Sequence, residues 1–244
     1  MTSMITHHNA LNASNITFSE LRKNAKGGKI VYLSGGKGKE KITVQFPKLR
    51  APFGLSEFVD QNSGSSSYSL DLSLENKPEL LEKLKAIDDA VVKQVAANSK
   101  EWLGKKHTEV VIRDVLYRPL VKMPNDDKYA PTIKLKILKD RDGTFIPECY
   151  NNKKQRVDLD TVEKGQSVTA IATIPQLWII DGKFGVTMRL HMARFSPTNK
   201  ITGYSFLPDD DDDEVEAEEA VAETTTDEAE EEFEGEEDDI VDDC

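Results

Sequence analysis

Lysine and arginine alternate with apolar residues in several short segments, a spacing that suits phosphate binding. In APTIKLKIL, residues 130–138, Lys134 and Lys136 fall on the opposite face of a strand from Ile133, Leu135 and Ile137. A strand of this kind can bury its apolar face in a core and present its cationic face to a phosphodiester chain. The pattern therefore predicts a polyanion-binding surface.

The segment GVTMRLHM, residues 185–192, repeats the pattern and predicts that Arg189 faces outward while Met192 faces the core. The glycine-rich GGKGKEK, residues 35–41, adds three lysines on a flexible backbone. A single strand lysine also fits an outer face that only keeps a sheet edge soluble. The candidate phosphate-binding cations are Lys37, Lys39, Lys41, Lys48, Arg50, Arg118, Lys122, Lys134, Lys136, Lys183 and Arg189.

Flat side chains beside cations are the second requirement for binding single strands, because every base offers a π face. Trp178 and Phe184 flank the Asp181-Gly182 dipeptide, next to Lys183. Aromatic residues are more often buried in a core than exposed as platforms, so each assignment competes with that alternative. The candidate stacking residues are Phe53, Tyr117, Tyr129, Trp178 and Phe184.

Catalytic and metal-binding patterns are not found in the sequence. The four histidines and Cys149 lack a metal-ligand spacing, and GGKGKEK lacks the spacing of a phosphate-cradling loop. Acidic pairs such as Asp126-Asp127 fit solvated loops better than a magnesium site. We therefore expect no catalytic residue, no cofactor and no metal, with a metal-dependent nuclease as the weakest alternative.

Short strands and two helices are predicted to position these residues. KIVYLSG (29–35), KITVQFPKL (41–49), SYSLDLSL (67–74), APTIKLKIL (130–138), TFIPECY (144–150) and SVTAIATI (167–174) read as strands. QLWII and KFGVTMRLHMARF form a hairpin through Asp181-Gly182, which supplies the positive φ angles of a tight turn.

An amphipathic helix is predicted between these strands, starting at Pro78 and ending before Gly104. Thr108 can cap a second, short helix that stops ahead of Pro119. The fold class is therefore mainly β. An oligonucleotide-binding (OB-fold) β-barrel with an inserted amphipathic helix plus a short helix fits best, because that barrel carries a helix between strands.

The last 36 residues, 209–244, contain 22 acidic residues and no basic one, which predicts a disordered tail. The whole chain has a net charge of -12, but residues 1–208 have 32 basic and 22 acidic residues, a net charge of +10. We expect a flexible N-terminal lead-in over 1–15, one domain over 16–208 and the tail over 209–244. A basic body with an acidic arm is typical of proteins that handle polyanions, although the tail alone would also fit a solubilising role.

The two cysteines, Cys149 and Cys244, predict no disulfide framework and an intracellular protein. No apolar run reaches the length of a membrane span, and the N-terminus lacks the pattern of a signal peptide.

Three stretches resemble the single-stranded-DNA-binding proteins of large eukaryotic DNA viruses: residues 102–138, the DRDGTFIPECYN that follows, and LWIIDGKFGVTMRLHMARF at 177–195. SYSLDLSL matches that family more loosely. The family is similar in turn to phage replisome single-strand binders, which have an oligonucleotide-binding barrel and an acidic C-terminal tail. The phage proteins finish on an aromatic residue, whereas this chain ends in Cys244 and its one tail aromatic is Phe233.

The resemblance implies single-stranded DNA binding with little sequence preference, in replication, recombination or repair, without catalysis. The tail would compete for the DNA groove and recruit a polymerase, primase or helicase, and a homodimer is a further expectation. Such a protein would work in the host nucleus or at a cytoplasmic viral replication site, or be packaged in the virion. The alternative is a histone-chaperone-like or virion packaging scaffold that binds basic partners through the tail.

Overall fold

The computed structural model describes residues 5–23, 27–36 and 40–198, which belong to the first of two units of the chain, Met1–Thr198. The second unit, Asn199–Cys244, lies outside the described residues. The tail predicted over 209–244 and two candidate cations, Lys37 and Lys39, therefore have no structural account.

Five strands close into a barrel: β5 (Glu40–Ala51), β7 (Ser66–Ser73), β10 (Thr132–Ile137), β13 (Gln166–Ile174) and β16 (Met188–Phe195). The ring runs β5-β7-β10-β16-β13 and returns to β5, and its β10–β16 contact is parallel while the other four are antiparallel. If the five barrel strands are numbered in chain order, their order around the ring is 1-2-3-5-4. This confirms the mainly β fold class with a barrel of the oligonucleotide-binding kind.

The barrel core is made by the alternating apolar residues that the sequence predicts. Leu70 and Leu72 of β7 and Ile133 and Leu135 of β10 are completely buried. Lys134 and Lys136, which alternate with the buried residues of β10, are exposed. The apolar face of each strand thus fixes which side chains the barrel presents outward.

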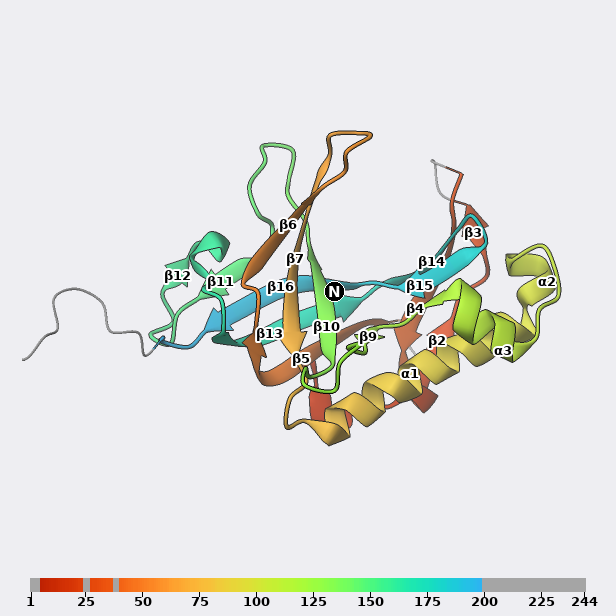
Figure 1. Cartoon of the computed structure of the whole chain (residues 1–244), viewed down its shortest axis with the longest axis horizontal. Coiled ribbons are helices and arrows are strands. Elements are labelled where there is room, and N and C mark those ends of the chain that lie inside the picture. The colour runs from red at the N-terminus through yellow and green to blue at the C-terminus, as the bar shows by residue number, and fades with distance from the viewer. Residues whose placement is uncertain (1–4, 24–26, 37–39, 199–244) are drawn as a thin grey trace, which may run out of the picture. The chain divides into compact units, whose positions relative to one another are not determined.

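The predicted amphipathic helix is α1 (Pro78–Ala97), with Pro78 in its first turn and Leu80, Leu84, Ile87, Val91 and Val95 buried. It crosses the lower part of Figure 1, below β14 and β15. Two shorter helices follow, α2 (Ser99–Trp102) and α3 (Glu109–Val111), and a π-helical turn covers Ile112–Leu116. The Thr108 side chain accepts a hydrogen bond from the Val111 amide, as expected of the cap.

A second group of strands extends from the barrel in the order β3-β4-β14-β15-β8: β3 (Arg22–Lys23), β4 (Lys29–Gly35), β14 (Gln176–Ile180), β15 (Lys183–Val186) and β8 (Tyr117–Arg118). The β14–β15 turn has φ angles of 49° at Asp181 and 75° at Gly182, which confirms the predicted hairpin. β2 (Ile16–Phe18) also pairs with β4.

The remaining strands extend the barrel edges. They are β1 (Ile5–His7), β6 (Leu55–Val59), β9 (Val121–Lys122), β11 (Glu148–Tyr150) and β12 (Arg156–Val157). β6 and β7 form a hairpin that rises beside the loop after β10 (Figure 1). Within the described residues, every helix is too short or too polar to span a bilayer.

Residues 5–15 differ from the flexible lead-in that the sequence predicts. β1 pairs in parallel with β5, two 3-10 turns follow at His8–Ala10 and Ala13–Asn15, and Leu11 is buried. Their polar composition hides this order, because one buried leucine and backbone pairing to a barrel strand hold the segment in place.

A β-bulge changes the predicted orientation of the last strand. Ala172 of β13 is opposite Leu190, but the next residue back, Ile171, is opposite Met192, so β16 has one extra residue, His191. After the bulge, the residues that face the core shift by one position along β16. Ala193 and Phe195 are buried, whereas Met192 is only half-buried. The prediction that Met192 faces the core is therefore wrong.

Candidate nucleic-acid interface

The outward side of β7 and β10 carries the first cluster of predicted cations. Lys134 is opposite Asp71 and Lys136 is opposite Ser69, and β9 places Lys122 opposite Thr132. All three lysines are exposed. Strands two and three of an oligonucleotide-binding barrel are the ones that usually contact the ligand, and here they are β7 and β10.

Two arginines extend this cluster along the neighbouring strands. Arg189 of β16 is the partner of Lys136 across the parallel contact, and Arg50 of β5 is the partner of Ser73. Arg189 is half-buried and Arg50 is exposed. We call this surface the barrel face: Arg50, Asp71, Lys122, Lys134, Lys136 and Arg189.

Asp71 is the acidic member of the barrel face, and it is buried. Its Oδ1 lies 3.8 Å from Lys134 Nζ, an ion pair without hydrogen-bond contact. Burial raises the pKa of the Asp71 carboxyl, opposed by the positive charges of Lys134 and Lys122. The carboxylate therefore offsets part of the positive charge of Lys134 on this face.

The second cluster lies on the sheet formed by β3, β4, β14, β15 and β8. Trp178 is opposite Gly185 on β15 and Ile30 on β4, and Arg22 is the next partner beyond Ile30. Ile180 is opposite Lys183 at the turn. Because 178 and 180 share one side of β14, these residues occupy one surface.

Trp178 is held against Arg118 by the glycine between them. A Cβ atom on Gly185 would lie 2.8 Å from Trp178 Cζ2, 2.9 Å from the Arg118 carbonyl oxygen and 3.0 Å from Arg118 Cβ. The Trp178 side chain and the exposed Arg118 therefore both approach the backbone of Gly185 so closely that no larger residue fits there. This explains why KFG rather than a bulkier sequence follows the turn.

Tyr32 completes this surface, with the Arg22 guanidinium carbon 5.7 Å from its ring centre. Tyr32 is 40% exposed and Ile180 is 52% exposed. We call this surface the hairpin face: Arg22, Tyr32, Arg118, Trp178, Ile180 and Lys183. β8 and β9 are separated by two residues, so the chain runs directly from Arg118 on the hairpin face to Lys122 on the barrel face.

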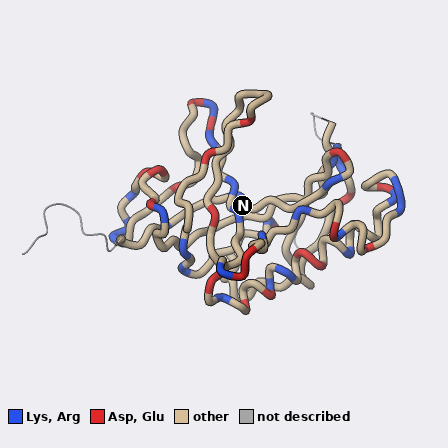
Figure 2. Tube along the Cα trace, in the orientation of Figure 1, with Lys and Arg blue, Asp and Glu red and all other residues tan. Residues whose placement is uncertain are grey.

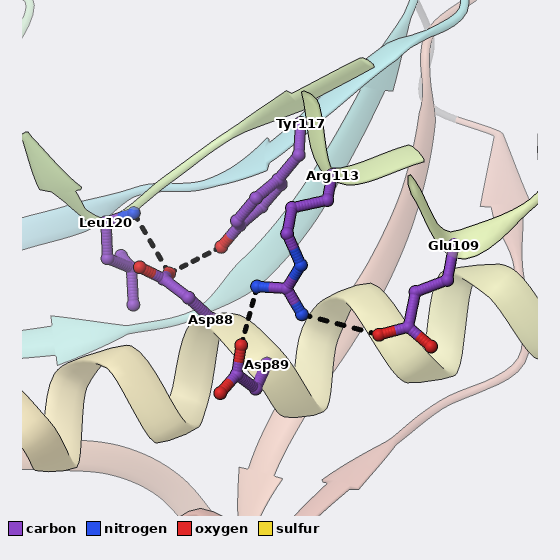
Figure 3. A network of polar contacts seen from close by, with 6 residues as sticks. All are labelled: Asp88, Asp89, Glu109, Arg113, Tyr117 and Leu120. Carbon is purple, nitrogen blue, oxygen red and sulfur yellow. Dashed lines mark hydrogen bonds and ion pairs between the residues drawn. The ribbon is translucent and has the colours of Figure 1, made fainter. Parts of the chain in front are cut away.

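Two predicted stacking residues, Tyr117 and Phe184, are part of the core instead. Both are buried, and their rings stack on each other with centroids 5.0 Å apart. The Tyr117 hydroxyl donates to Asp88 Oδ1 of α1 at 2.5 Å, and the Leu120 amide donates to the same oxygen at 3.0 Å (Figure 3). The prediction that these rings stack on bases is wrong, because α1 covers that side of the hairpin.

Nearby charges complete the network in Figure 3. Arg113 bridges Asp89 at 2.6 Å and Glu109 at 3.4 Å, both on exposed surface. Burial raises the pKa of Asp88, and burial with the adjacent Asp88 charge raises that of Tyr117. Asp88 thus fixes α1 to β8 and the residues that follow it, and Asp89 fixes α1 to the π-helical turn.

The other predicted residues lie away from the two faces or at their margins. Phe53 is 55% exposed in the turn after β5, and Tyr129 is 70% exposed in the loop before β10. Lys41 is opposite Ser34 on β4, and Lys48 is opposite Thr169 on β13. Both lysines are exposed.

Sequence reasoning missed Arg22 and Tyr32. The signal was present in KIVYLSG, where Ile30 and Tyr32 alternate with Val31 and Leu33, so Tyr32 faces away from a buried side. Arg22 gave no such signal because its two-residue strand is too short to show a period.

Charge is distributed over the whole described unit. Figure 2 shows Lys and Arg at several separate places along the tube, with Asp and Glu interspersed, and the β6–β7 hairpin carries neither Lys nor Arg. The cationic surface consists of local clusters, of which the barrel face is one. Among the described residues no group of three or more His, Cys, Asp or Glu is placed to hold a metal ion.

Comparisons with known proteins give the following matches. An uncharacterized protein of Acanthamoeba polyphaga mimivirus, L291, is 26% identical over 168 residues, which are 68% of this chain and 28% of the mimivirus protein. The match therefore spans under a third of the length of that relative.

Among solved structures, the single-stranded DNA-binding protein of bacteriophage Enc34 in complex with ssDNA matches with a TM-score of 0.40 at 12% identity, covering 75% of this chain and 97% of the phage protein. Bacteriophage T7 gp2.5, a single-stranded DNA binding protein, matches with a TM-score of 0.38 at 12% identity, covering 81% of this chain and 99% of gp2.5. The match to a family model covers residues 60–210, more than half of the sequence, and on that basis the chain belongs to the family of unknown function DUF5871.

Proposed function

We propose that this protein binds single-stranded DNA with little sequence preference, through the barrel face and the hairpin face together, and without catalysis. The observation that carries the proposal is the half-buried Trp178, which meets exposed Arg118 at Gly185, on a surface connected through β8 and β9 to the lysines of the barrel face. Aromatic platforms beside a cationic groove are how proteins bind single strands irrespective of sequence.

Each face supplies a different part of the interaction. Lys122, Lys134, Lys136 and Arg189 neutralise phosphates, and this attraction does not depend on the bases. Trp178 and Tyr32 offer flat surfaces on which bases stack.

The acidic segment 209–244 is proposed to compete with DNA for the cationic faces. A tethered polyanion acts at an effective concentration of about a millimolar, which weakens loose contacts and excludes duplex more than a well-stacked single strand. Once displaced, it would recruit a polymerase, primase or helicase by charge. Replication, recombination or repair in the nucleus or at a viral replication site is the setting that this activity fits, and a homodimer or virion packaging belongs to the same proposal.

Intrinsic fluorescence tests the proposal directly, because Trp102 is 4% exposed and Trp178 is half-buried. Titration with oligo-dT should quench the emission, and log affinity should fall with log salt by about 0.7 per phosphate contacted. The Trp178→Phe variant should lose the quenching while retaining the salt dependence in a fluorescence-independent assay such as anisotropy of labelled DNA. Absence of binding at low salt in both assays would favour the scaffold that binds basic partners.

A further inference from the structure

A row of cations crosses the barrel, starting at Lys48 of β5, two residues from Arg50 at the edge of the barrel face. Lys48 of β5 is opposite Thr169 of β13, which is in turn opposite Arg194 of β16. Arg194 is also opposite Tyr150 of β11, and Tyr150 is opposite Arg156 of β12. The row thus follows five neighbouring strands, β5, β13, β16, β11 and β12. At about 4.8 Å per strand it is about 19 Å long.

The members of this cross-strand row all face outward. Their neighbours Leu49, Val168, Ala193 and Cys149 are buried, so the alternate residues point away from the core. Lys48, Arg194 and Arg156 are exposed, and Thr169 and Tyr150 are half-buried. β13, at the middle of this surface, is the one strand of the ring that pairs with neither β7 nor β10.

A hollow of about 280 Å³ lies along the row. It is lined by Gln45, Tyr150, Lys154, Thr169, Ile171, Met192, Ala193 and Arg194. The bulge in β16 creates it, because the extra residue turns Met192 outward beside Ile171. The hollow therefore has two half-buried apolar side chains, an aromatic ring and two cations on its lining.

The ring and one cation of the hollow are fixed by local hydrogen bonds. The Tyr150 hydroxyl donates to Glu148 Oε2 at 2.9 Å. Asn151 Oδ1 accepts from the amides of Lys153 and Gln155, at 2.9 and 3.0 Å, which holds the turn that carries Lys154. None of the four ion pairs between described residues involves the cations of the row or Lys154.

We propose that the cross-strand row is a second contact for single-stranded nucleic acid, in which the hollow takes a base and the cations take the flanking phosphates. The inference rests on the proposed function and extends it: one strand continues from the barrel face, past Arg50 and Lys48 of β5, onto a second surface of the same barrel. A base offers a flat π face to a ring and to apolar side chains, and the two cations can take its flanking phosphates, which matches the composition of the hollow. The row would hold about five or six nucleotides at the 3.4 Å rise of a stacked strand.

Strand length separates this second contact from the first. Oligo-dT of about 8 nucleotides, near the low end of the 4–16 that one such barrel covers, fits on the barrel and hairpin faces alone. Oligo-dT of about 32 nucleotides, twice the upper end of that range, reaches the row as well. The test uses a double variant, Arg194→Ala plus Arg156→Ala, called the row variant. Its matched control is Lys85→Ala plus Lys100→Ala, which removes the same charge from exposed helix positions.

The expected result is that the row variant reduces the salt slope for the long strand by about 1.4, since two phosphate contacts are lost at about 0.7 each. Its affinity for the short strand should match that of the control. Tyr150→Ala should weaken binding of the long strand alone, and Tyr150→Phe, which keeps the ring, should not.

An unchanged slope for the long strand, or an equal loss for both lengths, would overturn the inference while leaving the proposed function intact. Failure of the unmodified chain to bind either length would overturn both. A polyglutamate peptide serves as the competing ligand: if the row variant loses peptide binding but keeps the long strand, the row is a protein-docking site and the inference is wrong.

Discussion

Trp178 is the residue on which base stacking most depends, because it is the one tryptophan of the two that is not buried. Trp178→Ala should weaken oligo-dT binding by about 1–3 kcal/mol, the contribution of one stacked base, whereas Trp178→Phe should retain most of it. The salt slope should stay unchanged because no phosphate contact is removed. Anisotropy titrations at several salt concentrations measure both quantities.

The control for this prediction is Val110→Ala, which removes an exposed apolar side chain, 68% accessible, on α3. It should leave binding as it was. If the two alanine variants bind equally well, the indole contributes packing within the hairpin rather than a platform.

Asp71 gives the protein a pH-dependent stability term. Burial raises the pKa of its carboxyl in the folded chain, so the folded state takes up a proton more readily than the unfolded state does. The ionised carboxylate therefore opposes folding at neutral pH, and that effect disappears as the pH falls through the raised pKa. Asp71→Asn should stabilise the protein at pH 7 and have a smaller effect at pH 4, in denaturant unfolding followed by circular dichroism.

Substituting the exposed Asp142 by Asn provides the comparison, and it should leave the free energy of unfolding nearly unchanged at both pH values. Destabilisation by Asp71→Asn at pH 7 would mean that the ion pair with Lys134 outweighs the cost of burial.

The side chains that the sequence assigned correctly are those whose strand shows a clear period. Lys134 and Lys136 face outward because Ile133, Leu135 and Ile137 must be buried. Tyr117 and Phe184 were assigned wrongly because each lies next to a cation in the sequence, whereas burial depends on a helix far away in the chain. A local pattern cannot show which side of a hairpin that helix covers.

At the scale of elements, the position of α1 depends on a few polar contacts as well as on its apolar stripe. Tyr117 and Leu120 both donate to the buried Asp88, which joins the helix to the segment between the two faces. Tyr117→Phe removes one of these donors from a buried carboxylate and should cost about 1–3 kcal/mol of stability. Equilibrium unfolding measures the loss.

Because β8 also pairs with β15, this substitution should loosen the strand that carries Arg118 and reduce oligo-dT affinity to a smaller extent. Tyr129→Phe, in the exposed loop before β10, is the matched substitution and should not alter stability. Equal stability of the two variants would show that the Asp88 contact is replaced by water.

Helix α1, the Thr108 cap and the Asp181-Gly182 hairpin could be predicted because each has a local signal: an apolar period, a capping residue and a turn dipeptide. The bulge in β16 could not, since one extra residue leaves no mark in the composition of MRLHMARF. Its consequence is large, because it exchanges the sides of Met192 and Ala193 and so opens the hollow on the cross-strand row. Register decides which cations become neighbours, and register is a property of strand pairs rather than of single segments.

At the scale of the whole molecule, the described unit presents cations on several surfaces, and most belong to separate clusters. A single strand that follows the barrel face and the hairpin face meets phosphate-binding and stacking groups in turn. The cross-strand row would add a third surface, which meets the barrel face on β5 at Lys48 and Arg50. An arrangement of this kind favours a flexible strand over a stiff duplex, because only a flexible strand can bend to reach more than one face.

The last prediction concerns the acidic segment. Removing residues 209–244 changes the net charge from -12 to +10. The truncated chain should bind oligo-dT more tightly at low salt and discriminate less against duplex DNA, because a competing polyanion has been removed. The gain should shrink as salt rises, since the Debye length falls from about 10 Å at 0.1 M to about 3 Å at 1 M. A full-length chain in which the 22 acidic residues of this segment are replaced by their amides separates charge from length: it should bind as the truncated chain does, and binding equal to that of the unmodified chain would restrict the segment to a solubilising role.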